Sequence, residues 1–164
     1  MRRACRKNAP LGETDSKAPE GTEGAGGIEA VMTTVLFACV HNAGRSQMAA
    51  AFFNALADPT KARAISAGTA PAERVHPQVA DAMLEAGIDL RKAKPQRLTD
   101  QLAHESAMIV TMGCEDACPV VPGGRRLEWT LRDPKDRYPS EVREIRDEIR
   151  SLVESLVRTE GVSK

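Results

Sequence analysis

The sequence predicts an α/β protein: a single domain in which a four-stranded parallel sheet has helices on both faces. Short apolar runs of the kind that fill buried parallel strands alternate with segments whose apolar residues recur at helical spacing. The chain has 164 residues, the size of one ordinary domain, and 41% of them are hydrophobic, which is enough for a packed core. Repeated strand–helix alternation is typical of a parallel sheet covered on both sides.

The first 31 residues differ from the rest of the chain. Five of the 12 glycines lie there, together with mixed charges and no aromatic residue. Such a segment buries too little apolar surface to offset the entropy cost of ordering it. We therefore expect residues 1–31 to be a disordered tail and residues 32–160 to form the domain.

Four segments are expected to form the strands. Residues 34–38 are a short apolar run, and residues 107–112 are the clearest strand after it. Residues 64–67 form a weaker strand that ends at Gly68, and residues 126–129 form the fourth. We expect the strand at 107–112 to lie beside the first one in the sheet.

Four helices are expected between and after these strands. The first covers residues 45–57 and ends at Asp58-Pro59, because proline cannot continue a helix. Gly87 caps the end of the second, Thr99 begins a short third helix that runs to about Glu105, and Ser140 begins the last. Apolar residues at helical spacing mark the first (Met48, Phe52, Leu56), the second (Val75, Val79, Met83) and the last (Val142, Ile145, Ile149, Leu152, Val153, Leu156).

Charge and composition exclude several classes of function. Lys plus Arg and Asp plus Glu both number 23, whereas binding to nucleic acid or an anionic membrane requires a basic surface. The apolar runs are too short to span a bilayer. Four cysteines are too few for the disulfide framework of a small secreted scaffold, and no signal peptide is recognisable. We expect a cytoplasmic, reduced monomer that binds neither nucleic acid nor membrane.

The loop between the first strand and the first helix has the residues of an oxyanion site. Ligands of open α/β sheets bind at the C-terminal ends of strands, where this loop lies. Its backbone N–H groups and the helix N-terminus would converge on a tetrahedral anion, and Arg45 can add a bidentate grip. The same field favours the thiolate of Cys39, which makes it a nucleophile. The expected loop consists of Val40, His41, Asn42, Ala43, Gly44, Arg45 and Ser46.

Three small residues support this interpretation of the loop. Gly44 permits a tight backbone path, Asn42 can lock the loop or bind an ion, and Ser46 can donate a hydrogen bond to the thiolate. The alternative is a buried structural cysteine near an unrelated arginine, because Cys-x5-Arg is a short pattern. The position between a strand and a helix favours the functional interpretation.

The chain resembles the low-molecular-weight protein tyrosine phosphatase family, and specifically its arsenate reductase branch. The resemblance runs from Thr33 to about Val157 and implies the same fold. It is carried by residues 35–37 leading into 39–49, by residues 110–114, by residues 116–119, and by Trp129 ahead of Asp133-Pro134.

The resemblance implies a role for three residues of this chain. Cys39 would attack the oxyanion, Arg45 would hold it, and Asp133 would protonate the leaving oxygen. An aspartate with this role must carry a proton in the closed site. The alternative for Asp133 is a turn residue before a proline, which is common.

Two features favour the reductase branch over the phosphatases. Phosphatases of this fold usually have proline after the Arg-Ser pair, where this chain has Gln47, and aromatic residues beside the Asp-Pro acid, where this chain has Lys135 and Asp136. Only 3% of the residues are aromatic, so the site is better suited to a small inorganic anion than to a phosphotyrosine ring.

Cys114 and Cys118 follow the strand that we place beside the first one. Reduction of arsenate to arsenite needs two electrons, which a thiol pair can supply. The resemblance implies that Cys39 forms an arseno-adduct, that Cys114 attacks Cys39 as arsenite leaves, and that Cys118 carries the disulfide outward to thioredoxin. Because the Cys114–Cys118 spacing is shorter than in well-known thioredoxin-coupled members, the alternative is an external thiol, mycothiol or glutathione, with a glutaredoxin-like partner.

Zinc is the alternative ligand for this cysteine pair. His41 would be a third ligand, but structural zinc sites usually present two close pairs, and His76 and His104 stand alone in the sequence. We expect no metal and no bound cofactor, with arsenate as substrate and phosphate and sulfate as competing anions. The other functions considered are a low-molecular-weight protein tyrosine phosphatase and a non-enzymatic module that senses oxyanion or arsenite.

Overall fold

The computed structural model describes residues 32–113 and 124–164 of the chain. The expected tail at 1–31, Cys114 and Cys118 therefore lie outside the described residues. Thr33–Lys164 forms one compact unit. Its elements in chain order are β1 (Thr33–Cys39), α3 (Arg45–Leu56), β2 (Ala62–Gly68), α4 (Pro77–Glu85), α5 (Asp100–Glu105), β3 (Met108–Thr111), β4 (Arg125–Glu128) and α6 (Pro139–Thr159).

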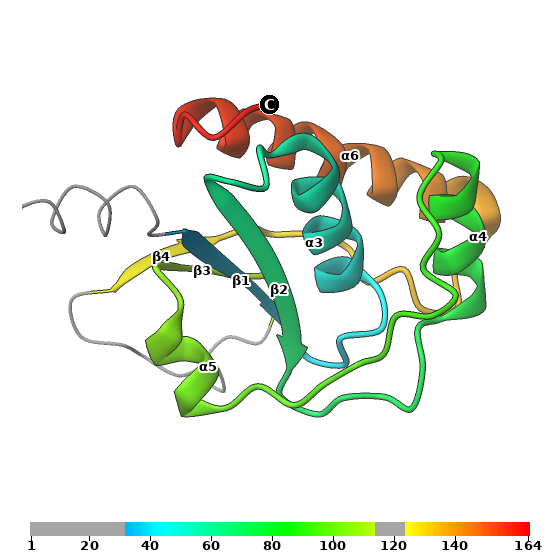
Figure 1. Cartoon of the computed structure of the whole chain (residues 1–164). Helices are drawn as coiled ribbons and strands as arrows, with labels where there is room; N and C mark the ends of the chain where they lie inside the picture. The colour runs from blue at the N-terminus through cyan, green and yellow to red at the C-terminus, as the bar shows by residue number, and fades with distance from the viewer. Residues whose placement is uncertain (1–31, 114–123) are drawn as a thin grey trace, which may run out of the picture. The chain divides into compact units, whose positions relative to one another are not determined.

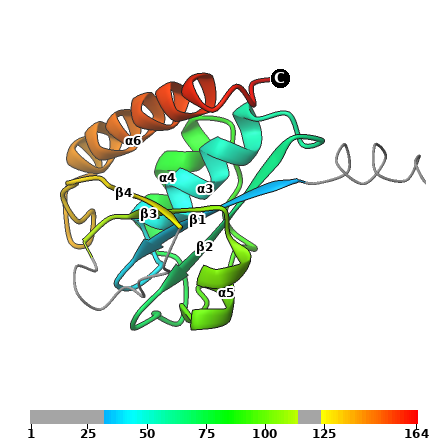
Figure 2. The same cartoon turned by 90° about the vertical axis from the view of Figure 1, so that its left-hand side faces the viewer.

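The expected sheet is confirmed. Four parallel strands pair in the order β2-β1-β3-β4, so β1 lies in the interior of the sheet with β3 beside it. Helices α3, α4 and α6 cover one face and α5 covers the other, as both views show (Figures 1 and 2). Alternate residues of β1 supply the two cores: Phe37 belongs to the larger core under α3 and α6, and Leu36 to the smaller core under α5.

Aromatic packing joins the sheet to its neighbours. The ring of Phe37 meets Phe53 of α3 edge-on with the centroids 6.0 Å apart, and Trp129, just after β4, with the centroids 5.7 Å apart. Asn54 of α3 bonds both the N–H and the C=O of Ala64 in β2. These contacts hold the first helix, and therefore the loop that precedes it, in a fixed position over the sheet.

Two of the expected caps are confirmed. Gly87 has φ +87° and ends α4, with its N–H bonded to Leu84 O and the Ile88 N–H bonded to Met83 O. Thr99 accepts a hydrogen bond from the Leu102 N–H at 3.1 Å and begins α5.

The expected start of the last helix is wrong. Helix α6 begins at Pro139, after Tyr138 as N-cap, rather than after Ser140. Proline fits the first helical position because its missing N–H would be unpaired there, and Glu141 reaches back to accept from the Tyr138 N–H at 3.3 Å. The chain remains part of the packed domain beyond residue 160, where we expected the domain to end. Val162 is buried in the larger core, and Ser163 forms a β-bridge with Ala57.

Candidate functional site

Cys39 is the last residue of β1, at the C-terminal edge of the sheet. Gly68 of β2 is its register partner, and the Met112 N–H, just after β3, bonds Ala38 O at 2.7 Å. A side chain at position 68 would collide with the loop, since a Cβ there would lie 2.5 Å from Val40 O. The neighbouring strand therefore needs glycine at this point for the loop to turn away from Cys39.

The loop turns its carbonyl groups outward. Each C=O from Cys39 to Gly44 accepts a hydrogen bond from outside the loop, mostly from the segment between β2 and α4. None of the N–H groups of Ala43, Gly44 and Arg45 donates to a backbone carbonyl of the described residues. Because the carbonyls point away, the amide groups are left for an anion above Cys39. The donors, in order from Cys39 O to Gly44 O, are Thr69 N, Ala70 N, Ala72 N, Gln47 Nε2, His76 N and Met48 N.

A hydrogen-bond chain with a defined direction ends at the Cys39 sulfur. The Gln96 backbone N–H donates to Asn42 Oδ1 at 2.9 Å, so the other end of that amide, Nδ2, faces Ser46 and donates to its Oγ at 2.7 Å. The Ser46 hydroxyl is then free to donate its proton to Cys39 Sγ, 2.8 Å away. The Asn42 N–H also donates to this sulfur at 3.3 Å. Two hydrogen-bond donors, the Ser46 hydroxyl and the Asn42 N–H, are therefore within reach of the Cys39 sulfur.

Arg45, the first residue of α3, lies between this loop and the segment after β4. Its Nη1 donates to Leu131 O at 3.3 Å, and its Nη2 lies 3.8 Å from Asp133 Oδ2. Gly113, the residue before Cys114, has φ +98°, and a Cβ there would lie 2.7 Å from Arg45 Nη1. The structure thus brings Asp133 to Arg45, which follows the Cys39 loop directly, and it places the chain just ahead of Cys114 against the same guanidinium.

His76 is a site residue that the sequence did not indicate. It precedes α4, its N–H bonds Ala43 O, and its ring lies near Gly44. Burial lowers the pKa of His76 below its usual value; Lys135 and His41 act in the same direction, and the carboxylates of Asp133 and Asp136 oppose them. His76 is therefore predominantly neutral at pH 7. The only sequence signal at His76 is the proline that follows it, and a proline there indicates the start of a helix, not a functional side chain.

His41 and the cysteines do not form a metal site among the described residues. The Nδ1 atom of His41 lies 3.1 Å from Ala70 O, which supports a packing role in the loop. Within residues 32–113 and 124–164, no group of three His, Cys, Asp or Glu side chains could hold a metal ion. The zinc alternative involves Cys114 and Cys118, which lie outside these ranges.

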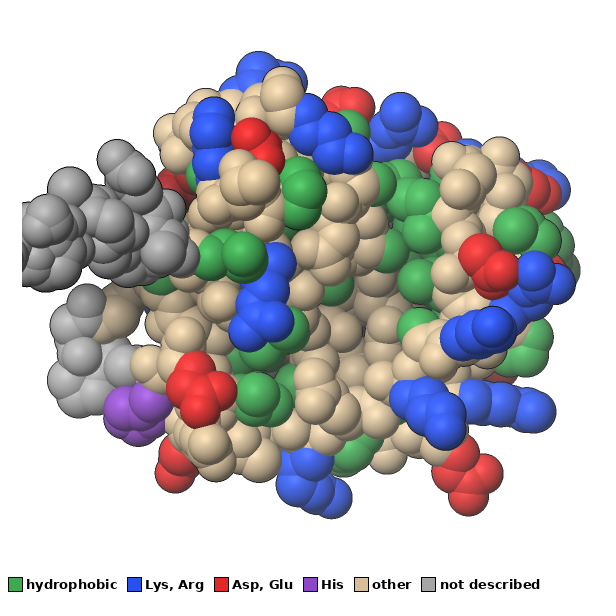
Figure 3. Space-filling view, viewed as in Figure 1, with side chains coloured by type: hydrophobic (Ala, Val, Ile, Leu, Met, Phe, Trp, Pro, Cys, Tyr) green, Lys and Arg blue, Asp and Glu red, His purple; other side chains and the backbone are tan. Residues whose placement is uncertain are grey.

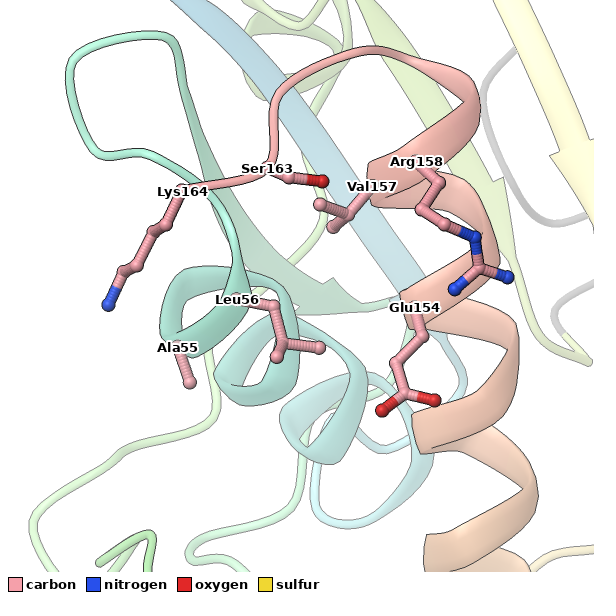
Figure 4. A pocket seen from close by; sticks show the side chains of 7 residues that line it. All are labelled: Ala55, Leu56, Glu154, Val157, Arg158, Ser163 and Lys164. Carbon is pink, nitrogen blue, oxygen red and sulfur yellow. The ribbon is translucent and has the colours of Figure 1, made fainter.

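Two cavities differ in their relation to this site. One of about 330 Å³ opens beside the guanidinium and is lined by Arg45, Gly113, Glu128, Trp129, Thr130 and Leu131. A larger one of about 410 Å³ lies where the C-terminal ends of α3 and α6 meet, with Leu56 facing Glu154 and Val157 (Figure 4). The second cavity is at the far end of α3 from Cys39, so it is not part of the anion site.

The surface carries both signs of charge. On the face shown in Figure 3, Lys and Arg side chains are interspersed with Asp and Glu. Oppositely charged side chains also form ion pairs, as between Arg143 of α6 and Glu85 of α4 at 2.9 Å. No helix in the described part of the chain is long and apolar enough to cross a membrane.

A cysteine beneath a ring of backbone amides, with an arginine at the start of the following helix, defines a class of α/β proteins that bind a tetrahedral oxyanion over a nucleophilic sulfur. The sequence profile of the low molecular weight phosphotyrosine protein phosphatases matches residues 34–164. The chain belongs to that family.

Relatives within the family carry a more specific name. Arsenate reductase 2 of Staphylococcus epidermidis is 34% identical over 127 residues, which are 74% of this chain and 94% of that protein. A thioredoxin-dependent arsenate reductase of Corynebacterium glutamicum is 37% identical with a TM-score of 0.70; the match covers 82% of this chain but 65% of that one. An arsenate reductase of Archaeoglobus fulgidus is 36% identical with a TM-score of 0.65, over 75% of this chain and 98% of that one.

Proposed function

We propose that this chain is an arsenate reductase in which Cys39 attacks arsenate and thiols supply the electrons. The observation that carries the proposal is the directed hydrogen-bond chain from Gln96 through Asn42 and Ser46 to the Cys39 sulfur. It directs hydrogen-bond donors at the sulfur that we propose as the nucleophile. The relatives that match most of the chain at 34% to 37% identity are named arsenate reductases, which favours arsenate over a phosphate ester.

The first step forms a bond between sulfur and arsenic. The Cys39 thiolate attacks arsenic(V), one oxygen of arsenate leaves as water, and the adduct keeps arsenic in the same oxidation state. Arg45 and the loop amides hold the remaining oxygens. Asp133 delivers a proton to the leaving oxygen; its Oδ2 is 3.8 Å from the arginine that holds the anion.

The second step transfers two electrons. The Cys114 sulfur attacks the Cys39 sulfur, the sulfur–arsenic bond breaks, and its electron pair stays on arsenic, which leaves as arsenite. The proton of the Cys114 thiol goes to solvent, and a Cys39–Cys114 disulfide remains. Support for Cys114 comes from its neighbour Gly113, which lies against Arg45 at the end of β3.

Cys118 then attacks Cys114, which breaks the Cys39–Cys114 bond, releases Cys39 as a thiolate and leaves a Cys114–Cys118 disulfide for an external reductant to reduce. Thioredoxin is the donor we favour, because one structural relative is described as thioredoxin-dependent. A low-molecular-weight thiol, either mycothiol or glutathione, is the other source of electrons, with a glutaredoxin-like protein to recycle it. Phosphate and sulfate compete with arsenate, since the loop recognises the shape and charge of a tetrahedral anion.

The test is a coupled arsenate-reduction assay of the wild type and Cys114→Ser. It compares thioredoxin with its reductase, glutaredoxin with glutathione, and mycoredoxin with mycothiol. We expect turnover by the wild type with thioredoxin, and loss of that turnover in Cys114→Ser. Normal reduction by Cys114→Ser with a small thiol would show that the internal relay is wrong. Hydrolysis of p-nitrophenyl phosphate without any arsenate turnover would favour the phosphatase alternative.

A further inference from the structure

Gln47 on α3 makes contacts that the proposed chemistry does not use. Its residue is 6% exposed, and its Nε2 donates both to Asn42 O at 3.1 Å and to Asn42 Oδ1 at 3.2 Å. Both acceptors belong to a single residue, which is completely buried. A buried carboxamide that spends its donor group on one neighbour holds that neighbour in place.

The backbone acceptor is one of the six loop carbonyls. Five of them accept from backbone N–H groups, whereas Asn42 O accepts from the Gln47 side chain. Asn42 also has φ +51°, in the left-handed region that non-glycine residues seldom adopt. Without Gln47, this carbonyl would lose its partner and the strained residue would lose a restraint. Rotation of the Asn42 peptide would then turn an oxygen toward the bound anion.

The side-chain acceptor sets the direction of the hydrogen-bond chain. Two donors, Gln47 Nε2 and the Gln96 N–H, converge on Asn42 Oδ1 and keep Nδ2 pointed at Ser46. Because Asn42 donates to Ser46 Oγ, the Ser46 proton is available to the Cys39 sulfur, 2.8 Å away. Gln47 therefore acts on the sulfur through two intermediate side chains and touches no reacting atom.

We infer that Gln47 is a positioning residue: its carboxamide locks Asn42 so that the loop keeps its amides on the anion and Ser46 keeps its proton on the Cys39 thiolate. The inference rests on the same loop as the proposed function and deepens it. It explains why a hydrogen-bond donor follows the Arg-Ser pair in this chain, at a position where proline would leave Asn42 O unpaired.

The main test variant is Gln47→Met, which keeps the length of the side chain and removes its donor. Alkylation of Cys39 by iodoacetamide is followed against pH by mass spectrometry of the Cys39 peptide, and inorganic phosphate is titrated for protection of that peptide. We expect the alkylation midpoint to rise by about half to one pH unit. We expect the phosphate concentration that gives half-protection to rise about 3- to 10-fold.

The pH readout requires the other titratable or charged groups around the loop to stay the same. Among the described residues these are His41 from the loop, Arg45 from α3, His76 ahead of α4, and Asp133 after β4. None is changed by Gln47→Met. Gln101→Met is the matched control, because Gln101 is an exposed residue of α5 that bonds Glu105. We expect it to shift neither midpoint.

A double-mutant cycle separates positioning from general packing. If Gln47 acts through Ser46, Gln47→Met shifts the alkylation midpoint less in a Ser46→Ala background than in the wild type. Equal shifts in both backgrounds, or no shift in a folded Gln47→Met protein, would overturn the inference. Gln47→Leu serves as a second donor-free variant, and loss of the folded state in both would show that Gln47 is a packing residue. None of these readouts uses arsenate, so they remain informative if the proposed function is wrong.

Discussion

The two segments that meet at Arg45 are held in different ways. In the loop after β1, Asn42 and Ser46 are fully buried, and every carbonyl from Cys39 to Gly44 is bonded from outside the loop. In the segment after β4, the Asp133 side chain is 45% exposed and accepts a hydrogen bond from the Lys135 N–H, while Arg137 donates to the Asp133 backbone carbonyl. The loop proposed to bind the anion is therefore held by many hydrogen bonds, whereas Asp133, the proposed acid, lies on a segment with few restraints.

The two segments touch at a few points. A Cβ on Gly44 would lie 2.7 Å from Pro134 Cγ, and Arg45 bonds Leu131 O and faces Asp133. These contacts fix the position of Asp133, the proposed acid, relative to the loop proposed to bind the anion. Changes on the two sides should separate binding from proton transfer, and the predictions below run from the largest expected effect to the smallest.

Cys39→Ser should abolish arsenate turnover. A serine hydroxyl is not ionised in this site, so the nucleophile is lost. The loop amides and Arg45 remain, so phosphate should still bind, as calorimetry can show. Measurable turnover by this variant would contradict the assignment of Cys39 as nucleophile.

Asp133→Asn should lower kcat by about 10²- to 10⁴-fold, the usual contribution of a general acid. Phosphate should bind as well as before or better, because the carboxylate no longer competes for Arg45. Steady-state kinetics and phosphate inhibition measure the two effects. Asp136→Asn is the control on the same segment. Asp136 has φ +59°, which asparagine tolerates, so this variant should keep the activity of the wild type. Equal losses in both variants would count against Asp133 as the acid.

Gly44→Ala should disturb the contact between the two segments. The added methyl group overlaps the ring of Pro134, so one segment must shift, at a cost of about 1–3 kcal/mol in the free energy of unfolding. Denaturant unfolding measures this cost. Pro134→Ala in the same chain should recover most of it, because it removes the overlapping atoms. A double variant no more stable than Gly44→Ala would place the strain elsewhere.

His76→Gln should make stability less dependent on pH in mild acid. The pKa of His76 is lowered in the folded state, so the unfolded chain binds more protons below about pH 6.5. The stability that depends on neutral His76 is therefore fully present above about pH 7. It is lost as the pH falls from the pKa of His76 in the unfolded chain toward its lower pKa in the folded protein. Thermal unfolding between pH 5 and 7.5 should show a flatter profile for the variant; parallel profiles would contradict this role.

Sequence periodicity was sufficient for the fold because it reports burial. The run at 34–38 and the spacing in α6 identify a buried strand and a helix face, and both lie in the core. Boundaries were less secure: Ser140 has the chemistry of a cap, but Pro139 and Glu141 start the helix earlier. Several neighbouring residues can each be suited to the start of a helix, and the hydrogen bonds formed in the folded protein decide which of them becomes the N-cap.

The sequence by itself determined the α/β class, the order of strands and helices along the chain, and the loop between the first strand and the first helix that we propose as the anion site, because these depend on local pattern and spacing. Only the tertiary structure decided that Gln96, His76 and Pro134 reach this loop from separate segments, and that Gln47 contacts Asn42 twice. Contacts between residues far apart in the chain leave no periodic signal in the sequence. They arise only once the sheet has brought the strand ends together.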